Sequence, residues 1–254
     1  MHGFTTRCRR SLWLLVAALA LPALATAAGP PDYTLFDDVL TPNVNKGYVD
    51  YDGIAANPRF GRFLTALAEA PRPANRDEEL ALLINAYNAF AISGILQGYS
   101  PSSRLGRWRF FERLEFTLSG EPITLEDLEH KRLRTLGEPR IHFAIVCASL
   151  SCPRLASRAY RPETLDRDLD AATRGFVNDV TRNHYDIAQR TAFLSSIFDW
   201  FRGDFETGGS TLPSFLARYV QDPAVRAALL EGRLAIRHLD YDWGLNGRFS
   251  GNND

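Results

Sequence analysis

The sequence predicts an α+β protein, in which helices pack against a small, mainly antiparallel sheet. Segments with helical periodicity are frequent, whereas strand-like segments are short and few, and the two kinds do not alternate as in a βαβ fold. The 254 residues are 45% hydrophobic and 23% charged, which is ordinary for a globular chain. This composition excludes collagen-like, low-complexity and wholly disordered classes.

The helical segments show apolar residues at steps of three and four, together with residues that start or stop a helix. In the clearest segment, Leu80 and Ile84 begin an apolar stripe that Gly98 is expected to end. Thr124, with Asp127 three residues later, resembles a capping box. Helices are therefore expected over residues 78–97, from Thr124 onward, over 163–180 and 213–220, and from Pro223 to Gly232.

Strand signals are fewer, and one of them is strong. Residues 140–147 are short, apolar and rich in β-forming residues, which predicts a strand buried on both faces. The remaining strands are expected in two pairs, 116–118 with 121–123 and 185–188 with 192–194.

The N-terminus has the three parts of a secretory signal peptide. Arg7, Arg9 and Arg10 form a positive head, residues 12–24 are almost entirely apolar, and residues 25–27 read Ala-Thr-Ala. The apolar run of about 13 residues is short for a membrane-spanning helix, which needs about 20. We therefore expect a signal peptide over residues 1–27, with an uncleaved N-terminal anchor as the alternative.

Export changes the charge of the chain. Its 29 Lys+Arg and 30 Asp+Glu give a formal net charge of −1, and the loss of three arginines leaves −4. A chain with either net charge has no overall electrostatic attraction to nucleic acid or to an anionic membrane. We expect a periplasmic or secreted protein with no stable membrane anchor after cleavage, one domain over residues 30–246 and a flexible tail over 247–254.

Cleavage also removes Cys8 and leaves Cys147 and Cys152 in an oxidising compartment. At the end of the predicted strand, inside a Ser-rich loop that includes Ser149, Cys147 is well placed for a nucleophile. The alternative is a Cys147–Cys152 disulfide that closes a six-residue loop and contributes about 2 kcal/mol.

A thiol nucleophile needs a base, and the histidines of the mature chain are His130, His142, His184 and His238. In a straight strand His142 would lie roughly 16 Å from Cys147, on the opposite face. His130 follows Glu129 on a predicted helix, so these two side chains should point about 100° apart. A bulge, or a loop that brings Cys152 back along the strand, would restore His142 as a base.

Other polar and aromatic residues are interpreted as parts of the structure and not of a catalytic site. Asn85 and Asn88 lie one turn apart, as expected of buried amides that tie a helix to neighbouring backbone. Glu129, His130, His142 and the cysteines lack the spacing of a metal site, so no metal or cofactor is expected. The aromatic-acidic clusters at 198–201 and 241–243 are interpreted as the edge of a core, with the lining of a cleft as the alternative.

Several motifs together resemble the family known as domain of unknown function 547 (DUF547). They lie in order between about residue 45 and residue 220, with one departure at Phe201, where relatives often have tyrosine. The resemblance carries no established activity. The pattern that recurs in the family includes the Asn85/Asn88 helix, the Glu129-His130 pair, Arg140-x-His142 and both cysteines. These residue types would fit a distant kinship with papain-like or transglutaminase-like enzymes. The motifs are Tyr48-Val49-Asp50-Tyr51, Leu83-Ile84-Asn85-Ala86-Tyr87-Asn88-Ala89, Leu125-Glu126-Asp127-Leu128-Glu129-His130, the segment from Arg140 to Cys147, Ser151-Cys152-Pro153, and the segment from Leu194 to Phe201 with Asp204-Phe205.

Two functions follow from these residues. The first is a thiol-dependent hydrolase or acyltransferase, with Cys147 as nucleophile, a histidine base, a carboxylate or amide that orients it, and backbone N–H groups of the Cys147–Ser149 loop around the oxyanion. The second is a non-catalytic periplasmic binding or envelope-interaction module with a structural disulfide. The sequence does not identify the partner, for which a small molecule and a peptide are the two options, and the polar residue types favour a catalytic or small-ligand site.

Overall fold

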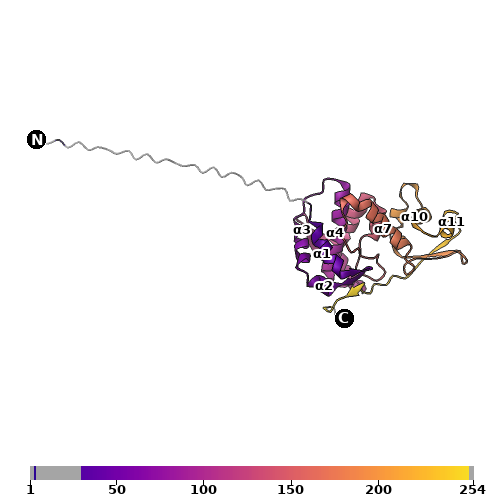
Figure 1. Ribbon diagram of the computed structural model, residues 1–254, viewed down its shortest axis with the longest axis horizontal. Helices are drawn as coiled ribbons and strands as arrows, with labels where there is room; N and C mark the ends of the chain where they lie inside the picture. Colours follow the sequence, from indigo (N-terminus) through magenta and orange to yellow (C-terminus); the bar gives the residue numbers. More distant parts are fainter. Residues whose placement is uncertain (1–2, 4–29, 252–254) are drawn as a thin grey trace.

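Helix α4 (Arg76–Leu96) forms the centre of the N-terminal part of the molecule (Figure 1). It starts at Asn75, whose side chain accepts a hydrogen bond from the backbone N–H of Glu78, and three acidic residues in its first turn complement the helix dipole. Every residue from Leu80 to Ile95 is buried, so the helix is covered on all sides. Its length and composition would allow it to cross a membrane, but it is the core helix of this fold.

The computed structural model describes Gly3 and residues 30–251, so the predicted signal peptide lies outside the described residues apart from Gly3. Short helices and strands precede and follow α4, and helices α1 to α3 pack around it (Figure 1). These elements are α1 (Tyr33–Asn43), β1 (Val44–Asn45), β2 (Tyr48–Asp50), α2 (Tyr51–Ala55), α3 (Pro58–Ala68), α5 (Arg104–Arg107), the π-helix η1 (Trp108–Arg113), β3 (Glu115–Leu118), β4 (Glu121–Thr124), α6 (Leu125–Asp127), the π-helix η2 (Leu128–Leu133), and the 3₁₀ turns η3 (Arg134–Leu136) and η4 (Pro139–Phe143).

The C-terminal part has its own aromatic core, in which Phe143, Phe176, Phe198, Phe205 and Phe215 pack together. Helix α7 lies between α4 and the end of the molecule that carries α10 and α11 (Figure 1). The elements here are η5 (Pro162–Thr164), α7 (Leu165–Val177), β5 (His184–Asp186), β6 (Thr191–Leu194), α8 (Ile197–Trp200), α9 (Arg202–Phe205), η6 (Thr207–Gly209), α10 (Leu212–Tyr219), α11 (Pro223–Leu230), β7 (Ala235–His238) and β8 (Gly247–Arg248).

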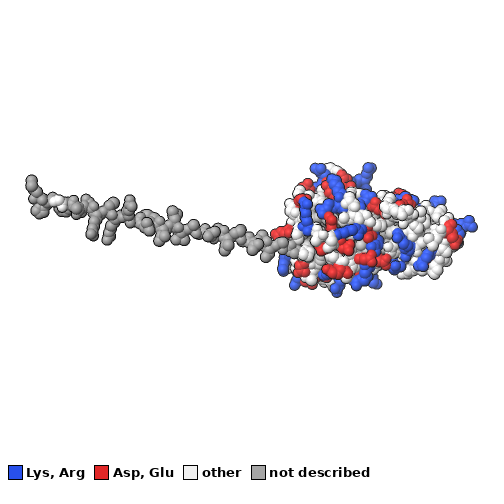
Figure 2. Space-filling view, turned by 90° about the horizontal axis from the view of Figure 1, so that it is seen from above, with Lys and Arg blue, Asp and Glu red and all other residues white. Residues whose placement is uncertain are grey.

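The strands form three small sheets, in the orders β1-β2-β8, β3-β4 and β5-β6-β7. Both predicted strand pairs are confirmed, because β3 pairs with β4 and β5 with β6, each antiparallel. The pairs β2–β8 and β6–β7 are parallel. With helices predominating over small, mostly antiparallel sheets, the predicted α+β class is confirmed. On the face seen in Figure 2, basic and acidic side chains are interspersed.

The predicted strand over residues 140–147 is wrong. Pro139 begins the 3₁₀ turn η4, with the Glu138 side chain accepting from the Arg140 N–H. The chain then extends without joining a sheet, because Asn88 takes the place of a neighbouring strand. Its Nδ2 donates to the Ala144 carbonyl at 2.9 Å, and its Oδ1 accepts from the Val146 N–H at 2.8 Å. The apolar run reflects burial on all sides, for which no strand is needed.

Residues 247–250 also differ from the expected flexible tail. Gly247 and Arg248 form strand β8 beside β2, and Phe249 packs edge-on against Tyr51. The Ser250 N–H and hydroxyl both bind the Asp52 carboxylate. A Cβ on Gly247 would lie against the carbonyl of β2, so only glycine permits this close strand approach. Long-range pairing, which the local composition did not show, orders this segment.

Candidate functional site

A small pocket of about 180 Å³ brings together most of the residues that the sequence singled out. It lies where η2, the segment after η4, α8 and the segment after β7 meet. Cys147, Cys152, Glu129, His130 and His142 all line it. Its other lining residues are mainly aromatic or apolar, namely Tyr87, Phe111, Glu126, Ile145, Pro153, Ile197, Trp200, Phe201, Tyr241 and Trp243.

Cys147 and Cys152 are joined as a disulfide, with their Cα atoms 6.2 Å apart. The loop between them turns at Ala148, which has a positive φ of 62°. Arg182 holds the loop from outside, because its guanidinium donates to the carbonyls of Leu150 and Cys152 at 2.9 and 2.7 Å. The disulfide therefore lies in a loop that Arg182 anchors from outside.

The groups that touch the sulfur atoms are two hydroxyls and one backbone N–H, that of Cys147, which donates to the Cys152 Sγ at 2.9 Å. The Tyr241 hydroxyl lies 3.2 Å from the Sγ atoms of both Cys147 and Cys152, and the Ser149 Oγ lies 3.1 Å from the Cys147 Sγ. Among the described residues, no hydrogen bond joins a histidine nitrogen to either sulfur. The expected thiol–histidine pair is thus not formed in this disulfide state, although His142 and Cys147 face the same pocket.

His142 is oriented by an ion pair on its far side. Its Nε2 lies 2.8 Å from Oδ2 of Asp204, and Arg134 donates to both oxygens of the same carboxylate at 2.7 and 2.9 Å. A carboxylate only accepts hydrogen bonds, so Nε2 carries the proton of the neutral ring and Nδ1 keeps its lone pair. The ring stacks on Phe201 with centroids 4.0 Å apart. The lone pair on Nδ1 then faces the Glu129 carboxyl, whose Oε1 is 3.9 Å away.

The environment shifts the pKa values of both His142 and Asp204. Burial lowers the pKa of His142, and its hydrogen bond to Asp204 opposes that effect only in part. Burial alone would raise the pKa of Asp204, but the hydrogen bonds from His142 and Arg134 outweigh it and hold the pKa well below its usual range. At neutral pH the ring is therefore neutral and Asp204 is ionised.

Glu129 is the titratable group with the most unusual position. It lies on the π-helix η2, its side chain is 12% exposed, and burial raises its pKa to about 7. The Tyr87 hydroxyl beside the carboxyl favours the ionised form and offsets part of this effect, while the charge on Glu126 adds to it. A π-turn inside a helix is often found at functional sites, and here it carries the acid into the pocket.

His130 also lines the pocket but belongs to a different set of contacts. Its Nδ1 accepts from Arg134 at 2.7 Å, and its Nε2 lies 3.5 Å from Glu126. As expected for sequence neighbours, Glu129 and His130 have different partners. Arg134 consequently links the two histidines, one directly and the other through Asp204.

The sequence of the chain matches one family of proteins. Residues 71–177 match the family described as "Protein of unknown function, DUF547". The chain carries a DUF547 region. The resemblance found in the motifs is thereby confirmed over these residues. No curated protein and no solved structure matches the chain.

The DUF547 region supplies Glu129, both pocket histidines and both cysteines, but it does not complete the pocket. Asp204, which orients His142, and Tyr241, which touches the disulfide, lie beyond residue 177. Trp200 and Trp243 also come from beyond it and stack against each other. The pocket therefore depends on the aromatic-acidic clusters that were interpreted as a core edge.

The other predicted site residues lie outside the pocket lining. Asn85 and Asn88 form the expected network, since Asn85 binds the backbone N–H and carbonyl of Tyr160 just as Asn88 binds the segment after η4. Arg140 pairs with Glu138 and Asp166, each at 2.8 Å. These residues hold the backbone around the pocket, and Ser149 supports the disulfide through its contact with the Cys147 sulfur.

Sequence reasoning missed Asp204 and Arg134 as site residues. Asp204 stood within the family motifs, but its part in orienting a histidine 62 positions away had no local signal. Within the described part of the chain, no group of three or more His, Cys, Asp or Glu side chains is arranged to hold a metal ion.

Proposed function

We propose that the chain is a hydrolase that works by general acid–base chemistry, with Glu129 as its proton-transfer group. The observation that supports this is the position of Glu129, a carboxyl with a pKa of about 7 that lines a pocket beside a neutral histidine. Its neighbour Asp204 has a pKa shifted in the opposite direction. Titratable groups whose environments separate their pKa values are typical of acid–base sites.

The pocket limits what such an enzyme would bind. A volume of about 180 Å³ is smaller than most sites for whole ligands, so it fits one side chain or acyl group of a larger substrate. The indole and phenyl rings of Trp200, Phe201 and Trp243 give that group an apolar wall. Substrates with a small apolar acyl or side-chain group next to an ester or amide bond suit this shape.

In the proposed reaction, ionised Glu129 takes a proton from a water molecule as the water oxygen attacks the carbonyl carbon. The carboxyl then returns this proton to the leaving oxygen or nitrogen as its bond to carbon breaks. A pKa near 7 suits both steps at neutral pH. His142 turns the lone pair on its Nδ1 towards Glu129, with Nδ1 3.9 Å from Oε1.

A second candidate is the thiol-dependent reaction, which is favoured by the position of the Cys147 sulfur in the same pocket. It requires the disulfide to be opened first, so that Cys147 becomes a free thiol. If neither group reacts, the pocket is a binding site and the disulfide a structural strap, as in the non-catalytic alternative.

The experiment measures the hydrolysis of p-nitrophenyl esters with acyl chains of increasing length. Glu129→Gln should reduce kcat/KM by about 100-fold, the lower range for loss of a general acid–base group. A variant with Cys147→Ser and Cys152→Ser should keep the activity. The matched control is Glu126→Gln, a half-exposed carboxyl on the same pocket. Full activity in Glu129→Gln would refute the proposal, and loss only in the cysteine variant would favour the thiol reaction.

We also propose that the protein acts after export, in the periplasm or outside the cell. The signal-like first 27 residues and the disulfide support this, because disulfides persist in oxidising compartments. Intact mass of the purified protein should correspond to a chain that starts at Ala28. A full-length chain in the cytosolic fraction with three free thiols, those of Cys8, Cys147 and Cys152, contradicts it.

A further inference from the structure

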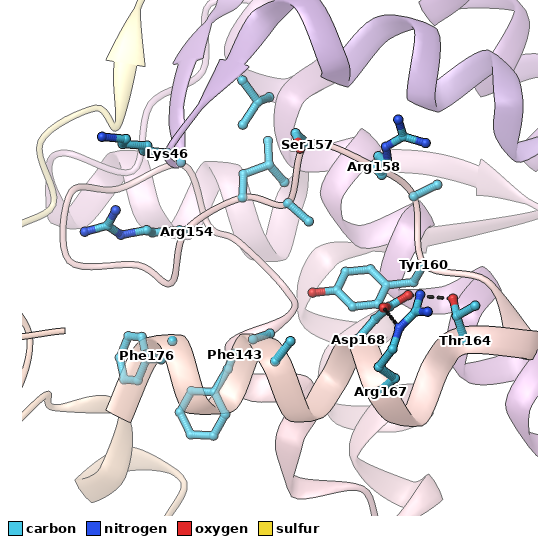
Figure 3. A pocket seen from close by; sticks show the side chains of 18 of the residues that line it. Lys46, Phe143, Arg154, Ser157, Arg158, Tyr160, Thr164, Arg167, Asp168 and Phe176 are labelled. Carbon is cyan, nitrogen blue, oxygen red and sulfur yellow. Dashed lines mark hydrogen bonds and ion pairs between the residues drawn. The ribbon is translucent and has the colours of Figure 1, made fainter. Parts of the chain in front are cut away.

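A second, larger cleft lies apart from the Glu129 pocket, and the proposed hydrolase does not use it. Its volume is about 1210 Å³. One side is the segment from Arg154 to Tyr160, which bends at Ser157 and Arg158, and the facing side is helix α7, along which this segment lies (Figure 3). Lys46, from the turn between β1 and β2, stands near Arg154 at one end (Figure 3). A cleft of this size takes several residues of a peptide.

Cations outnumber anions in the lining of this cleft. Five basic side chains and three acidic ones line it. Three of the basic residues are neutralised within the cleft, in the pairs Arg154–Asp179, Arg161–Asp37 and Arg167–Asp168. Lys46 and Arg158 form no ion pair with any residue that the structure describes, and both are exposed. In a chain with a formal net charge of −1, two unpaired cations in one cleft mark a site for negative charge.

The backbone of this segment is held by side chains of α1 and α4. Asp37 accepts from the Ala159 N–H at 2.7 Å, and the Thr41 hydroxyl donates to the Ser157 carbonyl at 3.1 Å. Asn85 binds the backbone of Tyr160 from the same core. By contrast, the N–H groups of residues 155–158 donate to no partner within the described chain. Backbone donors that are free next to a cleft can bind the carbonyl groups of a second chain.

The middle of the facing surface of α7 carries small residues. Ala171, Ala172 and Gly175 line the cleft, so no long side chain obstructs its centre. A Cβ added to Gly175 would meet nothing within 4 Å, which shows that the space above it is open.

We propose that this cleft binds an acidic peptide in extended form. The peptide backbone pairs with residues 155–158, and its carboxylates pair with Lys46 and Arg158. The free backbone donors and the small apolar surface of α7 distinguish this ligand from a nucleic acid or a polyphosphate, which would use the cations alone. The proposal is independent of the reaction at Glu129.

The test is fluorescence anisotropy with a fluorescein-labelled octapeptide of alternating Glu and Ala, added to the full mature chain. The variant Lys46→Glu with Arg158→Glu should bind about ten-fold more weakly or worse, because each change replaces an ion pair with repulsion. The charge-matched control is Arg104→Glu with Arg109→Glu, two exposed residues that do not line the cleft. All four positions are exposed, so both variants should melt at the wild-type temperature.

A second probe separates backbone pairing from simple charge attraction. The same octapeptide, N-methylated at every second residue, keeps its charge but loses half of its backbone donors, and it should bind at least about ten-fold more weakly. Equal binding of the methylated peptide, or displacement of the octapeptide by an equal charge concentration of inorganic polyphosphate, would assign the cleft to polyanions and overturn the proposal. It is also overturned if the wild type does not bind the octapeptide, or if the cleft variant binds like the control.

Discussion

Replacing Asp204 with asparagine should weaken both the fold and the pocket. The Asp204 carboxylate accepts hydrogen bonds from Arg134 at 2.7 and 2.9 Å and from His142 at 2.8 Å. An asparagine side chain has one acceptor oxygen in place of two, and its NH₂ group would face the N–H donors of Arg134 and His142. Both residues would therefore lose hydrogen bonds to position 204.

The size of the loss follows from the burial of the pair. Removing one partner of a fully buried ion pair costs about 3–5 kcal/mol, whereas an exposed pair contributes about 0–1 kcal/mol. Side-chain exposure is 24% for Asp204 and 30% for Arg134, which places the pair between these limits. We therefore expect Asp204→Asn to lower the free energy of unfolding by about 2–3 kcal/mol at pH 7, measured by urea denaturation.

The pH dependence gives a second, independent criterion. Because the pKa of Asp204 is lower in the folded than in the unfolded protein, its stabilisation is complete above the ordinary aspartate value of 3.8 and is lost as the pH falls through the folded value. The difference between wild type and Asp204→Asn should be constant from about pH 5 to 7 and shrink in more acidic buffer.

The control is Asp199→Asn, a neighbouring carboxylate that is 57% exposed and lies 3.8 Å from His238. It should change stability by less than about 0.5 kcal/mol. The reasoning is refuted if Asp204→Asn unfolds at the wild-type urea concentration with an unchanged m value. It also fails if the difference between the two proteins stays the same size in acid.

Three further changes test other parts of the structure. Asn88→Ala should cost about 2–4 kcal/mol in urea denaturation, because it leaves a buried carbonyl and a buried N–H without partners, and a loss below about 1 kcal/mol would contradict the network. Glu129→Gln should match the wild type in stability near pH 4 and exceed it by up to about 3 kcal/mol above pH 7, because folding raises the pKa of the carboxyl to about 7; parallel stability curves from pH 4 to 8 would count against this. Replacing both Cys147 and Cys152 with serine should cost about 2 kcal/mol, the chain entropy of a six-residue loop, and an equal loss on adding a reductant to the wild type would identify the disulfide as its source.

Much of the local structure could be predicted because it depends on residues close together in the chain. Thr124 accepts from the Asp127 N–H and starts a helix, and Asp222 accepts from the Ala224 N–H at the start of α11. Asn75 does the same for α4. Caps, hairpin turns and helical periodicity involve neighbours within about four positions, so their energies are present in the sequence itself.

The segment 140–147 shows where such reasoning fails. Its apolar run indicated burial correctly, since Ile141, Phe143 and Val146 are all buried. Burial alone does not choose between a strand and another conformation. The choice was made by Asn88, which binds the backbone from 58 positions away and takes the hydrogen bonds that a neighbouring strand would have used.

The sequence by itself determined the α+β class, the DUF547 resemblance and the set of polar residues around Cys147. The tertiary structure decided what they form: a disulfide whose sulfurs meet Tyr241, a histidine turned towards Asp204, and a carboxyl with a raised pKa beside them. The physical reason is distance along the chain. Hydrogen-bond partners and burial set the protonation and direction of each side chain, and here these partners come from residues more than 40 positions away.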